Sequence, residues 1–146
     1  MDDYSYISVE LTDDIEVELM AAVSAAGIPP APKHDFHCTV MLDKRKGKLD
    51  KPFTTIDPKR VFTAYVVSLD VLGDGLVFHL TSKELHEEHR RLCDAGYISP
   101  YDGYLPHMSL TYDFNDYDVL KLKSMLAGWA GRALTFSNQA YGITKL

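Results

Sequence analysis

The sequence has few of the residues that build covalent or metal-linked frameworks. Its only cysteines are Cys38 and Cys93, which indicates neither a disulfide framework nor a cysteine zinc site. No apolar run is long enough to cross a bilayer, and the acidic N-terminus lacks the basic and apolar regions of a signal peptide. We therefore expect a cytoplasmic protein with no membrane partner.

Positive charge is also scarce, with 15 Lys and Arg residues against 21 Asp and Glu residues and a net charge of −6. Binding to long nucleic acid needs many cations that neutralise phosphates, so we do not expect it. A small anionic ligand remains compatible with a local positive patch. One basic loop, residues 43–51, predicts either a flap that attracts substrate phosphates or a solvated surface loop.

What is present is ordinary for a globular protein. The 146 residues are 46% apolar and 25% charged, which suits a single domain over residues 1–146 with its own core. Gly73-Asp74-Gly75 predicts a hairpin between two apolar runs. We expect the protein to be a monomer. Periodicity predicts strands at 4–11, 36–42, 61–72, 76–81, 106–112 and 134–143, and helices at 12–26, 83–95 and 119–129. This order indicates an α+β fold with antiparallel sheets flanked by helices.

Two similar motifs lie about half a chain apart in the predicted strands. The first is His37-Cys38-Thr39-Val40, and the second is His107-Met108-Ser109-Leu110. Side chains alternate between the two faces of a strand, so each motif places a histidine and a hydroxyl on one face. The same pattern adds Thr111 to the face of the second motif. If the two strands are neighbours, they form one cleft with two histidines and two hydroxyls.

Such a set suits acid–base chemistry on a phosphodiester without a metal or another cofactor. Histidine titrates near neutrality, so His37 and His107 can serve as base and acid on opposite sides of a phosphorus atom. Thr39 and Ser109 can donate hydrogen bonds to the non-bridging oxygens. The sequence does not distinguish base from acid, or water from a ribose 2′-hydroxyl as the nucleophile.

The paired motifs resemble the signature of the two-histidine (2H) phosphoesterases. That resemblance implies a two-lobed fold with a central cleft and one motif from each lobe. Within the superfamily, the short acidic chain and the second motif are most similar to the phage anti-CBASS phosphodiesterases. This implies a cyclic di- or trinucleotide substrate, cleaved in the host cytoplasm without a metal. The alternatives are a 2′,3′-cyclic phosphodiesterase acting on RNA ends, a non-catalytic nucleotide-binding protein on the same scaffold, and a structural module whose motifs are coincidental.

Other residues are weaker candidates for the site. Tyr6 is predicted to stack on a base or only to cover the sheet, and Gln139 and Tyr141 are predicted to reach the cleft. Tyr101 and Tyr104, in the loop before the second motif, are expected to line a base pocket or to brace the strand. His79-Leu80-Thr81 also matches the start of the motif, so His79 is a reserve candidate. His34 and His37 would lie on opposite faces of a strand, which argues against a metal site.

Overall fold

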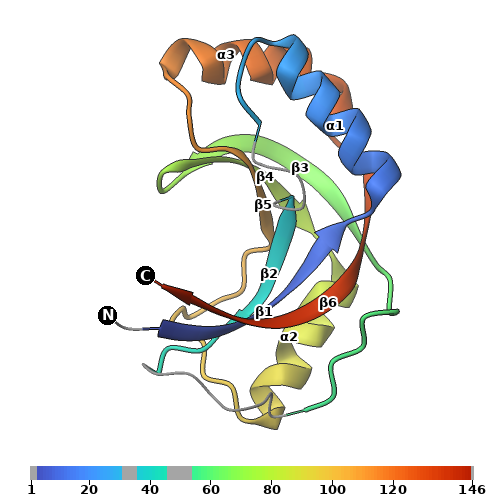
Figure 1. Ribbon diagram of the computed structural model, residues 1–146, viewed down its shortest axis with the longest axis vertical. Helices are drawn as coiled ribbons and strands as arrows, with labels where there is room; N and C mark the ends of the chain where they lie inside the picture. Colours follow the sequence, from blue (N-terminus) through green and yellow to red (C-terminus); the bar gives the residue numbers. More distant parts are fainter. Residues whose placement is uncertain (1–2, 31–35, 46–53, 146) are drawn as a thin grey trace.

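Alternating apolar and polar residues build the strands of the computed structural model, which describes residues 3–30, 36–45 and 54–145. Within these residues there are six strands, three α-helices and one short 3-10 helix (Figure 1). In chain order they are β1 (Asp3–Leu11), α1 (Asp13–Ala25), β2 (His37–Leu42), β3 (Phe62–Leu72), β4 (Gly75–Thr81), α2 (Lys83–Ala95), β5 (His107–Thr111), α3 (Asp116–Met125), η1 (Ala127–Trp129) and β6 (Ala133–Lys145). No helix among the described residues is long and apolar enough to span a membrane.

The strands form one closed antiparallel sheet in the order β1-β2-β5-β4-β3-β6. This order is symmetric about the line between β2 and β5, which we call the seam. On one side of the seam β1 and β2 are joined through α1, and on the other β4 and β5 are joined through α2. The predicted α+β class and antiparallel pairing are confirmed. The two expected lobes, however, are not separate sheets, because both strand–helix–strand units belong to the same closed sheet.

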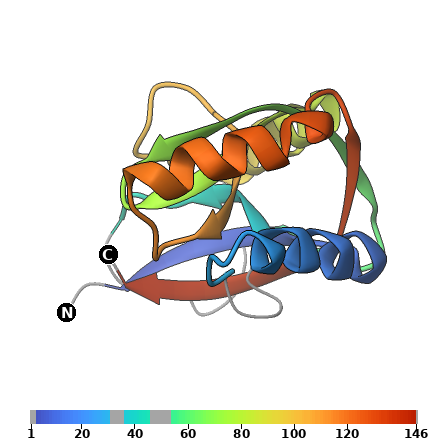
Figure 2. The same ribbon diagram turned by 90° about the horizontal axis from the view of Figure 1, so that it is seen from above.

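The helices lie toward opposite ends of the sheet, with α1 and α3 at one end and α2 at the other (Figure 1). Figure 2 shows α3 alongside β3 and β4, and α1 alongside β1 and β6. Helices α1 and α2 each bury a narrow stripe, with Leu19 and Val23 in α1 and Leu85 and Leu92 in α2. That spacing matches one face of a helix with 3.6 residues per turn.

Local signals explain where the elements begin and end. Ser82 caps α2 by accepting a hydrogen bond from the Leu85 backbone N–H, as the sequence predicts. Thr12 precedes α1, but its hydroxyl lies 2.8 Å from the Thr135 hydroxyl and makes no capping bond. The β3–β4 hairpin turns at Gly73, whose φ of +60° is a backbone conformation that glycine adopts without steric cost.

The apolar face of the sheet forms the core. Cys38 and Met108, the middle residues of the two motifs, are fully buried there together with Phe78. Phe78 also stacks on Trp129, with ring centroids 6.0 Å apart. Because neighbouring residues of a strand face opposite sides, burial of Cys38 and Met108 leaves the motif histidines and hydroxyls on the other face.

Candidate active site

The two motifs meet across the seam. Cys38 and Met108 are Cα partners in the antiparallel pair β2–β5. In an antiparallel pair, residues on either side of such a position are also opposite one another. His37 is therefore opposite Ser109, and Thr39 is opposite His107. All four are half-buried, so they are accessible to a ligand while held by the sheet. The structure brings together the four residues that the sequence predicts.

Strand geometry gives the dimensions of this square of side chains. Partners across neighbouring strands are about 5 Å apart, and residues two apart along a strand are about 6.7 Å apart. The histidines occupy diagonal corners, so their Cβ atoms are about 8 Å apart. A phosphate group can lie between two imidazoles at that separation, with a hydroxyl at each of the other corners.

One histidine has a defined tautomer. The Nδ1 atom of His107 lies 2.9 Å from the backbone carbonyl oxygen of Leu105. A carbonyl can only accept a hydrogen bond, so Nδ1 carries the proton in the neutral ring. The Nε2 atom of neutral His107 then has a lone pair and can accept a proton.

The residues next to the histidines along the sheet differ on the two sides of the seam. Glu10 of β1 is the Cα partner of His37, whereas His79 of β4 is the Cα partner of His107. A carboxylate therefore flanks one histidine of the square, and an imidazole flanks the other. From the sequence His79 is only a reserve candidate for the site, and the structure places it beside His107 of the second motif.

The cysteine within the first motif is not a nucleophile. Burial raises the pKa of the Cys38 thiol to about 11. At neutral pH the side chain is therefore a protonated thiol, which is a weak nucleophile. It faces the core, 3.5 Å from the Tyr104 hydroxyl, and not the square.

A cavity of about 680 Å³ adjoins the square on the His107 side. Thr39 and His107 form part of its lining, and Tyr101 and Tyr104 of the loop before β5 form another part. Leu42 and the hairpin residues Leu72 and Gly73 also contribute. Its volume suits a small ligand, and its aromatic lining suits a nucleobase. Tyr104 also braces the strand, because its hydroxyl donates a 2.9 Å hydrogen bond to the Thr39 carbonyl.

The three predicted substrate-binding residues have different positions. Tyr6 pairs with Leu42, which lines the cavity, and its ring lies directly over Gly142. Gln139 is not brought to the site. It is 2% exposed, its amide donates to Glu88 of α2, and its carbonyl accepts from the Asp57 backbone.

Tyr141 is not brought to the site either. It pairs with the buried Ile7 and packs on the core, with its hydroxyl 3.2 Å from that of Ser5. The cause is a bulge in β6 at Asn138, whose φ is +54°, where the register with β1 shifts by one residue. A one-residue bulge moves every later side chain to the opposite face.

A bulge in β5 has the same effect on Thr111. The register with β4 shifts between Ser109 and Thr111, and the Thr111 hydroxyl donates to the Pro29 carbonyl instead of facing the site. The basic residues 46–51 and His34 lie outside the described residues. Among the residues that are described, no cluster of three or more His, Cys, Asp or Glu side chains could hold a metal ion.

The fold and the site define a small α+β protein that presents paired histidine–hydroxyl motifs across the seam of a closed sheet. The chain belongs to the anti-CBASS protein Acb1 family, whose model matches residues 3–128. The matched range includes both motifs and both strand–helix–strand units. No curated protein matches the chain. Family membership supports a role in evading CBASS immunity.

Proposed function

We propose that this protein is a metal-independent phosphodiesterase of the 2H type that cleaves the 3′–5′ bonds of cyclic di- or trinucleotide signals. The observation that carries the proposal is the meeting of His37, Thr39, His107 and Ser109 across the seam, in a chain of an anti-CBASS family. On this interpretation, the two strand–helix–strand units that flank the seam correspond to the two lobes of the 2H fold.

The reaction needs a base, an acid and stabilisation of the phosphoryl oxygens. One imidazole takes a proton from the attacking oxygen, which forms the new P–O bond. The bond from phosphorus to the leaving oxygen breaks, and the second imidazole gives that oxygen a proton. Each of these proton transfers contributes on the order of 10²- to 10⁴-fold in rate.

The two hydroxyls are placed to stabilise the negative charge that develops on the phosphoryl oxygens. Thr39 and Ser109 occupy the corners between the histidines, so they can donate to the non-bridging oxygens of a phosphate in the square. Such donors accelerate the reaction when their bonds strengthen in the transition state. The neutral tautomer of His107 suits proton acceptance at Nε2, and after turnover the protonated ring can return that proton.

The direct test is incubation with 3′,3′-cyclic GMP–AMP, a cyclic trinucleotide and an RNA with a 2′,3′-cyclic end, all in EDTA. Products are analysed by mass spectrometry in H₂¹⁸O. We expect cleavage of the cyclic oligonucleotides, with ¹⁸O in the first product if water attacks and none if a ribose 2′-hydroxyl attacks. His37→Ala and His107→Ala should each lose at least 10²-fold in rate. Tyr117→Ala, at an exposed position of α3, is the control and should retain full activity.

The other outcomes separate the alternatives. Cleavage of the RNA end alone identifies a 2′,3′-cyclic phosphodiesterase. Binding of a cyclic dinucleotide without cleavage identifies a binding protein. Activity that appears only when a divalent metal is added contradicts the two-histidine mechanism.

A further inference from the structure

A third histidine continues the row of polar side chains beyond the catalytic square. His79 and His107 are Cα partners in the antiparallel pair β4–β5. Both residues are half-buried, and both lie on the face opposite the buried pair Phe78 and Met108. The two imidazoles are therefore neighbours on one polar surface, one strand apart. The acid–base chemistry proposed above uses only His37 and His107, so it leaves His79 without a role.

His79 lies one strand farther than His107 from a phosphate at the centre of the square. A phosphate at the centre of the square is about 4 Å from the His107 position, and His79 lies about 5 Å farther along the sheet. General acids and bases must reach the reacting group within about 3 Å, or through one water molecule. His79 is instead placed to meet a part of the substrate that lies beside the bond being broken.

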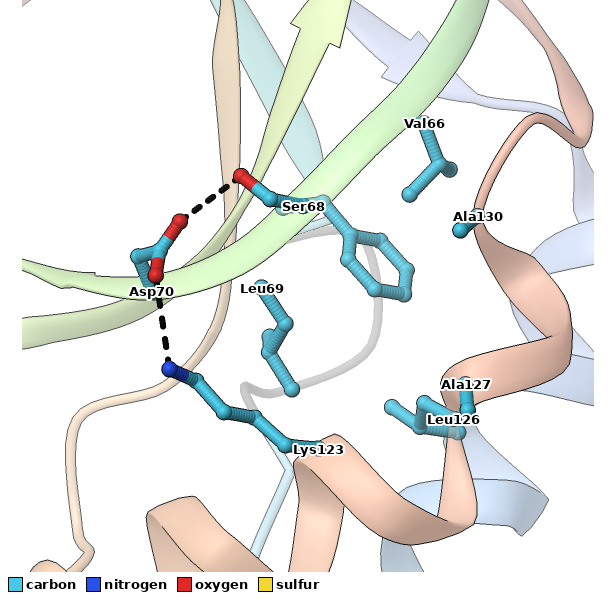
Figure 3. Close-up of a pocket in the computed structure, with 9 residues that line it drawn as sticks. Val66, Ser68, Leu69, Asp70, Lys123, Leu126, Ala127 and Ala130 are labelled. Carbon is cyan, nitrogen blue, oxygen red and sulfur yellow. Dashed lines mark hydrogen bonds and ion pairs between the residues drawn. The ribbon is translucent and has the colours of Figure 1, made fainter.

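A carboxylate sits on the far side of His79. The Nε2 atom of His79 lies 3.9 Å from Oδ2 of Asp70 on β3. Asp70 accepts a 2.7 Å hydrogen bond from the Ser68 hydroxyl, and the Lys123 ammonium of α3 lies 3.5 Å from its other oxygen (Figure 3). The Ser68 hydrogen bond, followed by Lys123 and His79, holds the pKa of Asp70 below its ordinary value despite partial burial. Asp70 is therefore a carboxylate at neutral pH.

This arrangement suits an imidazolium that binds an anion. An imidazolium has two N–H donors, so one can face Asp70 while the other donates to a phosphate oxygen. Hydrogen bonds between charged partners are the strongest in proteins. Lys123 offsets the charge of Asp70, so a protonated His79 keeps its positive charge for the ligand. The other side of the Asp70–Lys123 pair is a cavity of about 360 Å³ with an apolar lining that includes Val66 and Leu69 (Figure 3).

A cyclic oligonucleotide has a second phosphate one nucleotide away from the first. We propose that His79, oriented by Asp70, binds this second, uncleaved phosphate and so selects cyclic di- and trinucleotides over substrates with a single phosphodiester. The proposal rests on the proposed function, because it assumes that the square holds the phosphate being cleaved.

The test compares two substrates that share a scissile bond. One is 3′,3′-cyclic GMP–AMP, and the other is the linear dinucleoside monophosphate GpA, which has no second phosphate. His79→Gln should raise KM for the cyclic substrate about ten-fold, which is the loss expected for one hydrogen bond to a charged group. It should leave kcat for the cyclic substrate and kcat/KM for GpA within two-fold of wild type. Lys121→Gln, the same substitution at an exposed position of α3, is the control and should leave kcat and KM for both substrates within two-fold of wild type.

Binding gives a readout that does not depend on cleavage. In a His37→Ala background, titration calorimetry should show the same ten-fold loss for the cyclic ligand alone when His79→Gln is added. An equal loss for both ligands, or no loss for either, overturns the proposal. If the wild type cleaves neither substrate, the proposed function fails, but selective weakening of the cyclic ligand by His79→Gln still supports the second-phosphate site.

Discussion

The Tyr104 hydroxyl connects the loop before β5 to the backbone of the first motif, and Tyr104→Phe tests how much that connection matters. The ring stacks on His89 with centroids 4.5 Å apart and planes 3° apart, and phenylalanine keeps this packing. The substitution removes the 2.9 Å hydrogen bond to the Thr39 carbonyl and the 3.5 Å contact with the Cys38 thiol. Burial raises the pKa of the Tyr104 hydroxyl well above its ordinary value, so the group is a neutral donor at any physiological pH.

The expected loss of stability depends on the Thr39 carbonyl, which loses its hydrogen-bond donor. A hydrogen bond of this kind contributes about 1 kcal/mol net, and a buried acceptor left without its partner costs about 1–3 kcal/mol. For a chain of this length, 1 kcal/mol corresponds to about 2–4 °C in Tm. We therefore expect Tm to fall by about 2–12 °C in scanning calorimetry. Activity on 3′,3′-cyclic GMP–AMP should fall about ten-fold, because small displacements of a positioning group are costly in catalysis.

The matched control is Tyr101→Phe in the same loop. Tyr101 lines the same cavity but is 69% exposed, so loss of its hydroxyl should change stability by less than about 0.5 kcal/mol. The reasoning is refuted if Tyr104→Phe melts within 1 °C of wild type, or if the two variants are equally destabilised.

Three further predictions concern residues outside the square. Burial opposes ionisation of Glu88, but hydrogen bonds from Arg91 and Gln139 outweigh it and lower the pKa of Glu88. Its contribution to stability is therefore present above the ordinary pKa of 4.5 and lost as pH falls through the lower folded value. Glu88→Gln should cost about 1–3 kcal/mol in urea unfolding at pH 7 and less at pH 3, and an equal cost at both pH values would contradict this. Asn138→Ala should cost about 1 kcal/mol because of its positive φ, whereas Asn138→Gly should be close to neutral in the same assay. A Cβ at Gly142 would lie 2.8 Å from the Tyr6 ring, so Gly142→Ala should displace that ring and raise KM while changing Tm little; an unchanged KM would argue against Tyr6 as a substrate contact.

The motif strands could be predicted because their signals are local. Alternation around His37 and His107 determines which face each side chain occupies, and Ser82 and Gly73 mark the start of a helix and a turn. The pairing of β2 with β5 joins residues about 70 positions apart, and no local pattern specifies it. The sequence could state only what would follow if the two strands were neighbours.

The wrong expectations have a common physical origin. Alternation along 134–143 predicts Gln139 and Tyr141 on the cleft face, and the bulge at Asn138 reverses that assignment. Thr111 is reversed in the same way by the bulge in β5. A bulge depends on the partner strand as well as on the residue itself, so counting in steps of two along one strand does not reveal it. Asn138 gives a sequence signal for the bulge in β6, because asparagine tolerates a positive φ better than most residues.

The symmetry of the seam also affects how a ligand can enter. Rotation by half a turn about the Cys38–Met108 pair exchanges His37 with His107 and Thr39 with Ser109. A phosphate at the centre of the square would therefore meet a histidine and a hydroxyl on either side in both of the orientations that this rotation relates. The groups outside the square differ, because Glu10 flanks His37 whereas His79 flanks His107. On the proposed function, these neighbours and not the square itself decide which histidine acts as the base and which as the acid.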